Sequence, residues 1–107
     1  MTSGSGLGLI GLGLRAGTVT VGTGIVRAGL QRDDVVLVVV AGDASERTRS
    51  KVIGPAQARG IPVVAAPSAE ALGRAVGREQ VQAVGIRDRH LARGLRAGLP
   101  AVGSQEE

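Results

Sequence analysis

The sequence predicts an α/β protein, a three-layer α/β/α sandwich with a four-stranded mixed sheet. Four short apolar or β-branched segments alternate with helical patterns, so a helix is expected before, between and after the strands. One segment, residues 35–40, is continuously aliphatic, which is typical of a central strand buried on both faces. The length of 107 residues suits a single domain.

The spacing of apolar residues and the positions of glycines predict the helices and strands in the first third of the chain. Leucine and isoleucine recur at helical spacing over residues 7–14, and Gly17 is expected to end that helix. The alternating β-branched residues 18–21 predict a strand. A turn is expected at residues 22–24, after which a helical pattern resumes and continues to residue 31.

Capping residues predict the long middle helix. Asp43 or Ser45 can cap its start, and Glu46 follows Asp43 at the spacing of a capping box. The helix is expected to run to about Arg59. Pro55 lies inside it, where a proline permits a kink.

Capping residues, glycines and prolines also predict the helices and strands in the rest of the chain. Ser68 can cap a short helix, and Gly77 can end it in a left-handed conformation. Gly98 and Pro100 are expected to stop the last helix. The remaining strands and that last helix are expected at residues 61–65, 81–86 and 89–97.

The domain boundaries follow from composition. We expect residues 1–5 to be disordered and residues 6–99 to form a single domain. Residues 100–107 are expected to be a flexible acidic tail.

Composition limits the chemistry and suggests a polyanionic partner. The net charge is +4, and Lys51 is the one lysine among 13 basic residues. An arginine-rich surface fits a nucleic acid, but the codon bias of a GC-rich genome explains the same composition. The chain has no cysteine, no basic segment before its first apolar run, and no run long enough to span a membrane. We therefore expect a cytoplasmic protein with no membrane contact.

Catalytic and cofactor motifs are weak. The glycines of residues 6–11 match a dinucleotide-binding pattern, but no strand is expected before them, so a small-residue helix packed closely on a neighbour is favoured. His90 is the one histidine, and Asp88 beside it does not make a metal site. We expect no enzyme activity, no cofactor and no metal.

The turn at residues 22–24 is the best candidate for a binding site. Glycines there let a backbone approach an anion, and the N–H groups of a helix start point outward. Thr23 adds a hydroxyl, Arg27 follows one turn later, and Arg32 lies past the helix end. The alternative is an ordinary strand-to-helix turn that requires a positive φ. Because the chain has no aromatic residue, recognition would depend on phosphates, shape and hydrogen bonds rather than stacking.

Taken together, these pieces resemble the kink-turn RNA-binding ribosomal proteins of the large-subunit seven-Ae and thirty-e type, within them the short bacterial YlxQ-like branch. The likeness covers about residues 7–95. Its most specific motif is the Leu-Gly-Arg-Ala-Val-Gly string at residues 72–77. The other motifs are residues 12–17, Gly22, residues 38–45, residues 61–63 and residues 83–88.

The resemblance implies a sandwich that binds structured RNA at one end without catalysis. In such proteins the helix after the first strand enters the groove beside sheared G·A pairs, and the loop after the Leu-Gly-Arg helix covers bulged nucleotides. Carried over, the RNA-binding residues are Gly22, Thr23, Gly24, Arg27, Arg78, Glu79, Gln80 and Val81, with Arg74 close by.

The chain also departs from the family pattern. Many members have Asn-Glu where Gly24 and Ile25 stand, and Lys where Ala28 stands; these side chains read guanines and bind phosphate. Their loss implies weakened kink-turn specificity. We expect a monomer bound to kink-turn or ribosomal RNA, with ribosomal proteins as further partners. The alternative is a protein-interaction or assembly module that kept the fold and lost RNA readout, with Ile25 in an apolar contact patch.

Overall fold

The computed structural model describes residues 6–102. Within this range the chain forms five helices and four strands, in the alternating order that the sequence predicts. They are α1 (Leu7–Arg15), β1 (Val19–Val21), α2 (Thr23–Gln31), β2 (Leu37–Ala41), α3 (Glu46–Ala58), β3 (Val63–Ala66), α4 (Ala69–Ala75), β4 (Ala83–Ile86) and α5 (Arg89–Gly98).

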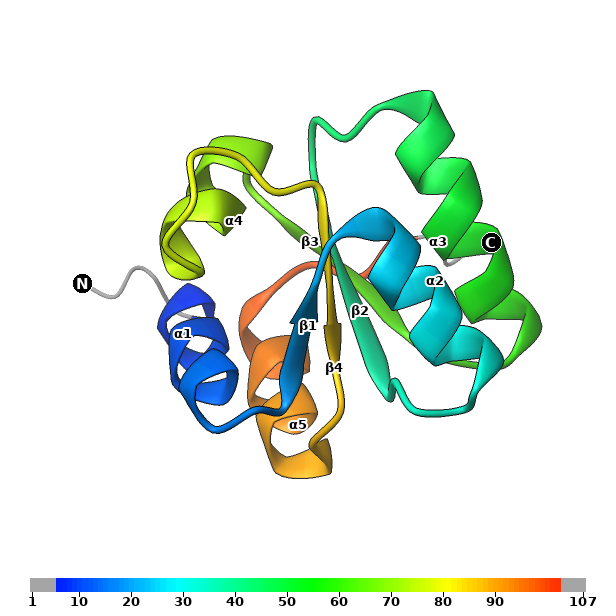
Figure 1. Ribbon diagram of the computed structural model, residues 1–107, viewed down its shortest axis with the longest axis horizontal. Helices are drawn as coiled ribbons and strands as arrows, with labels where there is room; N and C mark the ends of the chain where they lie inside the picture. The colour runs from blue at the N-terminus through cyan, green and yellow to red at the C-terminus, as the bar shows by residue number, and fades with distance from the viewer. Residues whose placement is uncertain (1–5, 103–107) are drawn as a thin grey trace.

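The strands form one mixed sheet with the order β1-β4-β2-β3. β4 lies antiparallel to both β1 and β2, whereas β2 and β3 are parallel. Helices α1, α4 and α5 cover one face, and α2 and α3 cover the other (Figure 1). The predicted three-layer sandwich with a four-stranded mixed sheet is therefore confirmed.

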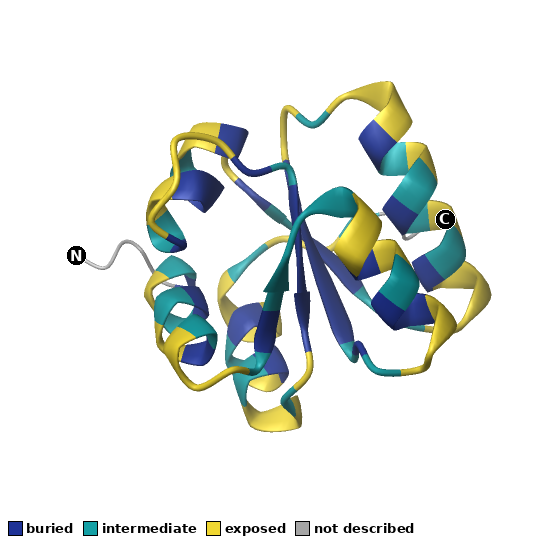
Figure 2. Cartoon of the chain, in the orientation of Figure 1, coloured by how far each residue is buried: buried dark blue, intermediate teal, exposed yellow. Residues whose placement is uncertain are grey.

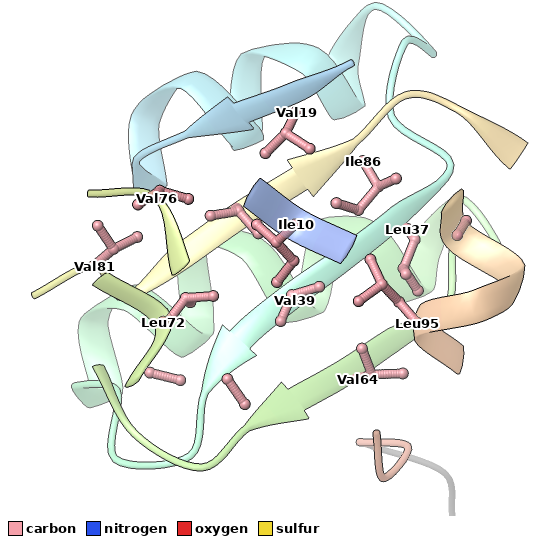
Figure 3. Packing of buried hydrophobic residues seen from close by; sticks show 14 of the residues in the cluster. Ile10, Val19, Leu37, Val39, Val64, Leu72, Val76, Val81, Ile86 and Leu95 are labelled. Carbon is pink, nitrogen blue, oxygen red and sulfur yellow. The ribbon is translucent and has the colours of Figure 1, made fainter. Parts of the chain in front are cut away.

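The core consists of aliphatic side chains on both sides of β2. All five residues of this strand are buried, as expected for a central strand (Figure 2). Because successive side chains of a strand point to opposite faces, Val39 packs with α1, α4 and α5, and Val38 packs with α2 and α3. On the first face, Ile10, Leu72 and Leu95 from the three helices converge over the sheet (Figure 3).

The strand-to-helix turn is shorter than the sequence predicts. Helix α2 begins at Thr23, so Thr23 and Gly24 are already helical. Gly22 alone makes the turn, with a φ of +114° that a side chain would strain. The positive φ that an ordinary strand-to-helix turn requires is thus present at Gly22.

The glycine-rich start of the chain packs as a small-residue helix. A Cβ on Gly13 would overlap Leu91 and Val19, and one on Gly11 would lie 3.1 Å from the Ala75 carbonyl oxygen. In the described chain no strand precedes α1. This close packing accounts for Gly6, Gly11 and Gly13 and favours the small-residue helix over the dinucleotide-binding interpretation.

Residues 100–102 differ from the expected flexible tail. The Pro100 carbonyl accepts a hydrogen bond from the Ala65 N–H at 2.9 Å, and the Val102 N–H donates to the Val63 carbonyl at 2.8 Å. This segment therefore pairs with the free edge of β3. Residues 1–5 and 103–107, for which disorder and a flexible tail are predicted, lie outside the described residues.

None of the helices formed by residues 6–102 has the length and apolarity required to cross a membrane.

Candidate nucleic-acid interface

Four connections meet at one end of the sheet. Since β4 is antiparallel to β1 and β2, it begins where those strands end, and β3 ends beside β2. The β1–α2, β2–α3, β3–α4 and α4–β4 connections therefore lie together, at the top of Figure 1. We call this the loop end of the molecule.

Gln82 and its neighbour Ala83 join three of these connections. Gln82 lies just before β4, and its carbonyl accepts the Ala41 N–H at 2.8 Å. Its side-chain Oε1 accepts the Ser45 N–H at 3.0 Å. The next residue, Ala83, accepts the Gly22 N–H at 3.0 Å. The α4–β4 loop is thus fixed directly to the starts of α2 and α3.

Asp43 joins the β2–α3 connection to α4. Its Oδ1 accepts the Ala69 N–H at 2.7 Å, so the carboxylate lies at the start of α4 rather than α3. Ser45 caps α3 instead, accepting the Thr48 N–H at 3.1 Å. From the sequence alone, Asp43 and Ser45 were alternative caps of the same helix. The Asp43–Ala69 contact spans 26 residues, so no pattern near Asp43 could have predicted it.

The start of α2 leaves backbone donors free. Gly22 provides no side-chain cap, and the first turn of α2 contains no acidic residue. The Val26 N–H makes the first helical bond, to the Gly22 carbonyl at 2.9 Å. The N–H groups of Thr23, Gly24 and Ile25 have no acceptor within residues 6–102, and the helix dipole adds partial positive charge there.

The other helices around the sheet contrast with this arrangement. Ser45, Ser68 and Asp88 provide side-chain caps for α3, α4 and α5. Helix α1 also has no side-chain cap, but Gly6 is buried at its start. Among the helices that begin at the loop end, α2 is thus the one whose start has neither a side-chain cap nor an acidic residue in its first turn.

Arg27 extends the positive character of this helix start. It is exposed and lies three and four residues after Gly24 and Thr23, so it lies on the same face of α2. It makes no ion pair with any described carboxylate.

The α4–β4 loop carries balanced charge. Arg74, Arg78, Glu79 and Gln80 line a shallow hollow of about 560 Å³ together with Glu70. Arg74 pairs with Glu70 at 3.6 Å, and both side chains are about 70% exposed. Two arginines and two glutamates give the hollow no net charge, so it offers hydrogen bonds rather than a basic field.

Two predicted site residues lie elsewhere. Arg32 follows the last residue of α2 at the opposite end of the molecule, where it pairs with Asp34 at 3.8 Å. Asp34 also pairs with Arg87, which follows the end of β4. Val81 is 6% exposed and belongs to the core. The length of α2 carries Arg32 away from the turn, and apolar packing buries Val81.

The described chain brings no three His, Cys, Asp or Glu side chains together in a metal-binding cluster. His90 is exposed in the first turn of α5, and its N–H donates to Asp88.

Comparison with known proteins agrees with this architecture. The model of the ribosomal protein L7Ae/L30e/S12e/Gadd45 family matches residues 6–95. The chain belongs to this family. Its members are non-catalytic, which confirms the expectation that the chain is not an enzyme.

Solved structures include similar chains. A Bacillus halodurans C protein of unknown function is 32% identical, with a TM-score of 0.81 over 86% of this chain and 93% of that chain. The Giardia lamblia 15.5kD RNA binding protein is 22% identical, with a TM-score of 0.73 over 85% of this chain and 78% of that chain. No functionally curated protein sequence matches the chain. Membership of the YlxQ-like branch stays a prediction.

Proposed function

We propose that this protein binds structured RNA through its loop end, without catalysis, in the manner of the family's kink-turn binders. The observation that carries the proposal is the uncapped start of α2, fixed beside the α4–β4 loop by the Gly22–Ala83 hydrogen bond of 3.0 Å. The RNA-binding Giardia lamblia protein of the same fold supports it.

Each part of the loop end has a chemical role in this proposal. The free N–H groups of Thr23, Gly24 and Ile25 bind a phosphate, as helix starts commonly do. Arg27 contacts the backbone one turn further along. The exposed loop residues Arg78, Glu79 and Gln80 offer hydrogen bonds to unpaired nucleotides.

Selectivity for a kink-turn is expected to be modest. The α2 start presents backbone and an apolar side chain at positions where the resemblance to kink-turn binders implies Asn and Glu. Phosphate contacts position a protein on RNA but do not read its sequence. We therefore propose binding that depends more on RNA shape than on base identity.

The test compares an arginine in the first half of α2 with one that follows its last residue. Arg27→Ala should weaken binding to a kink-turn RNA by about 1–3 kcal/mol, as should Arg78→Glu. Arg32→Ala is the control, because Arg32 is also exposed but follows the last residue of α2, at the opposite end of the molecule. Affinities are measured at one fixed, moderate salt concentration, since salt strongly alters such binding.

A second RNA with a mutated turn separates shape recognition from general attraction. Equal affinities for the two RNAs would remove the kink-turn claim. Equal effects of the Arg27 and Arg32 variants would remove the proposed site, and no binding to either RNA would remove the function.

Ile25 favours a second candidate, a protein-interaction module. Its side chain is 55% exposed in the first turn of α2, an apolar group in the middle of the proposed surface. A protein partner would remain bound after RNase treatment and be lost with Ile25→Lys. RNA binding that survives this substitution, with no protein captured, would exclude the module.

The family supports association with ribosomal or other structured RNA, and hence a cytoplasmic setting. We propose that the protein acts there as a monomer, with ribosomal proteins as possible neighbours on the same RNA.

A further inference from the structure

Helix α5 carries three arginines on one exposed face. Arg89, Arg93 and Arg96 are all exposed. At 3.6 residues per turn they fall within an arc of about 60° and extend about 10 Å along the helix axis. Leu95, on another side of the helix, is fully buried against the sheet. We call these three residues the α5 arginine row.

The row is not neutralised by the protein. Arg32, Arg59, Arg74 and Arg87 each pair with a carboxylate within 4 Å. Over residues 6–102, the three arginines of the row have no such partner. Asp88, the acidic residue nearest in sequence, accepts the N–H of His90 at the start of the helix.

The helix dipole favours Arg96 in the last turn of α5, but the stability of α5 does not account for Arg89 and Arg93. Arg89 stands in the first turn, where the helix dipole disfavours a positive charge. Arg89 and Arg93 are four residues apart, a spacing at which like charges repel. An external anion would relieve both effects.

The row also borders a concave surface. Arg89, Arg93 and Arg96 line a hollow of about 510 Å³ together with Val36, Pro62 and Ala92. Val36 precedes β2 and Pro62 precedes β3, so this hollow lies at the opposite end from the proposed binding loops. Figure 1 shows α5 there, in orange.

We propose that the α5 arginine row binds the phosphate backbone of a second RNA segment. Its length of about 10 Å corresponds to about three phosphates along the axis of one duplex strand, and Val36, Pro62 and Ala92 line the hollow beside it. That the polyanion is RNA rests on the proposed function. A protein that holds RNA at its loop end brings other parts of the same RNA backbone close to its remaining surfaces. The protein would then bridge two parts of one folded RNA.

The experiment measures how binding depends on salt for a kink-turn RNA with and without long duplex arms. The arms must exceed the 33 Å long axis of the protein, so that one RNA can reach both ends. Arg93→Gln/Arg96→Gln is compared with Arg15→Gln/Arg32→Gln, which removes the same charge from exposed positions outside both surfaces. Asp34 keeps Arg87 as a partner in that control. Circular dichroism establishes that each variant is folded.

The expected result is specific to the long-armed RNA. The α5 variant should reduce the slope of log affinity against log salt by about 1.5, at roughly 0.7–0.9 per lost phosphate contact. Neither the control nor the short RNA should show this change.

The other outcomes separate the two proposals. Equal slopes for the α5 variant and its control, with Arg27→Ala still weakening binding, would overturn this inference alone. An effect of the α5 variant without any effect of Arg27→Ala would keep the α5 surface and overturn the proposed loop-end site. Binding of polyglutamate as tight as RNA, lost in the α5 variant, would assign the row to acidic proteins. No RNA binding would overturn both proposals.

Discussion

At the scale of single residues, the start of α2 presents backbone N–H groups rather than polar side chains. Gly22 adopts a φ of +114°, and a Cβ added at Gly24 would meet no atom within 4 Å. Ile25 is largely exposed beside them. The surface therefore has room for longer side chains that this sequence does not supply.

Supplying those side chains should increase selectivity. We predict that Gly24→Asn/Ile25→Glu raises the affinity for kink-turn RNA about tenfold relative to the mutated-turn RNA, a gain of about 1.4 kcal/mol. The physical reason is that each new polar group can bond a base edge from an open position. Leu12→Glu is the matched control, because Leu12 is 59% exposed on α1 and lies outside the proposed site. An unchanged ratio of affinities would contradict the predicted orientation of α2 toward the bases.

At the scale of elements, the α4–β4 loop depends on its contact with α4. Gly73 is buried under this loop, and the Arg78 N–H donates to its carbonyl at 2.8 Å. A Cβ at residue 73 would come within 2.8 Å of the Glu79 carbonyl and the Gln80 nitrogen. Because these are backbone atoms, the loop itself would have to move.

Gly73→Ala should therefore lower the free energy of unfolding by about 1–3 kcal/mol, as overpacking usually does. The control is Gly8→Ala in α1, where a Cβ has open space and the helix should gain up to about 1 kcal/mol. Urea unfolding followed by circular dichroism measures both, since the chain has no aromatic fluorophore. Greater stability in both variants would show that the loop does not pack on Gly73 as described.

At the scale of the whole molecule, the surface suits a monomer. The large apolar side chains exposed among residues 6–102 are Leu12 and Ile25, which lie on different helices. Obligate dimers bury more than about 2,000 Å², mostly apolar. Two isolated side chains do not make such an interface.

The expected solution species is a single chain of 10.7 kDa. The Cα radius of gyration is 12.1 Å, close to the value of about 13 Å for a compact chain of this size. Light scattering combined with small-angle X-ray scattering measures both quantities. A stable species of twice the mass in the absence of RNA would contradict the prediction.

The sequence predicted local features well where the cause was local. The buried run around Val38, the cap at Ser68 and the left-handed glycine at Gly77 all appear as expected. Helix α3 also continues through Pro55, the position at which a kink was permitted. Each of these depends on residues within a few positions of one another.

Contacts between residues far apart in the sequence could not be predicted from the sequence alone. Asp43 bonds across 26 residues and Gln82 across 37, and neither partner is marked by any pattern near it. Arg27 and Arg32 were both candidates for one site, yet the length of α2 separates them to opposite ends of the molecule. Val81 was expected both in the α4–β4 loop and at the start of a strand over residues 81–86. It precedes β4, which begins at Ala83, and it is buried in the core.

The sequence by itself determined the fold class, because hydrophobic periodicity, caps and glycines act over one or two turns of chain. Only the tertiary structure decided which connections share an end, since that follows from strand direction and sheet order. The antiparallel placement of β4 between β1 and β2 sets the α4–β4 loop beside Gly22. The same folding brings Val36 and Pro62 under the α5 arginine row, a surface that no local pattern revealed.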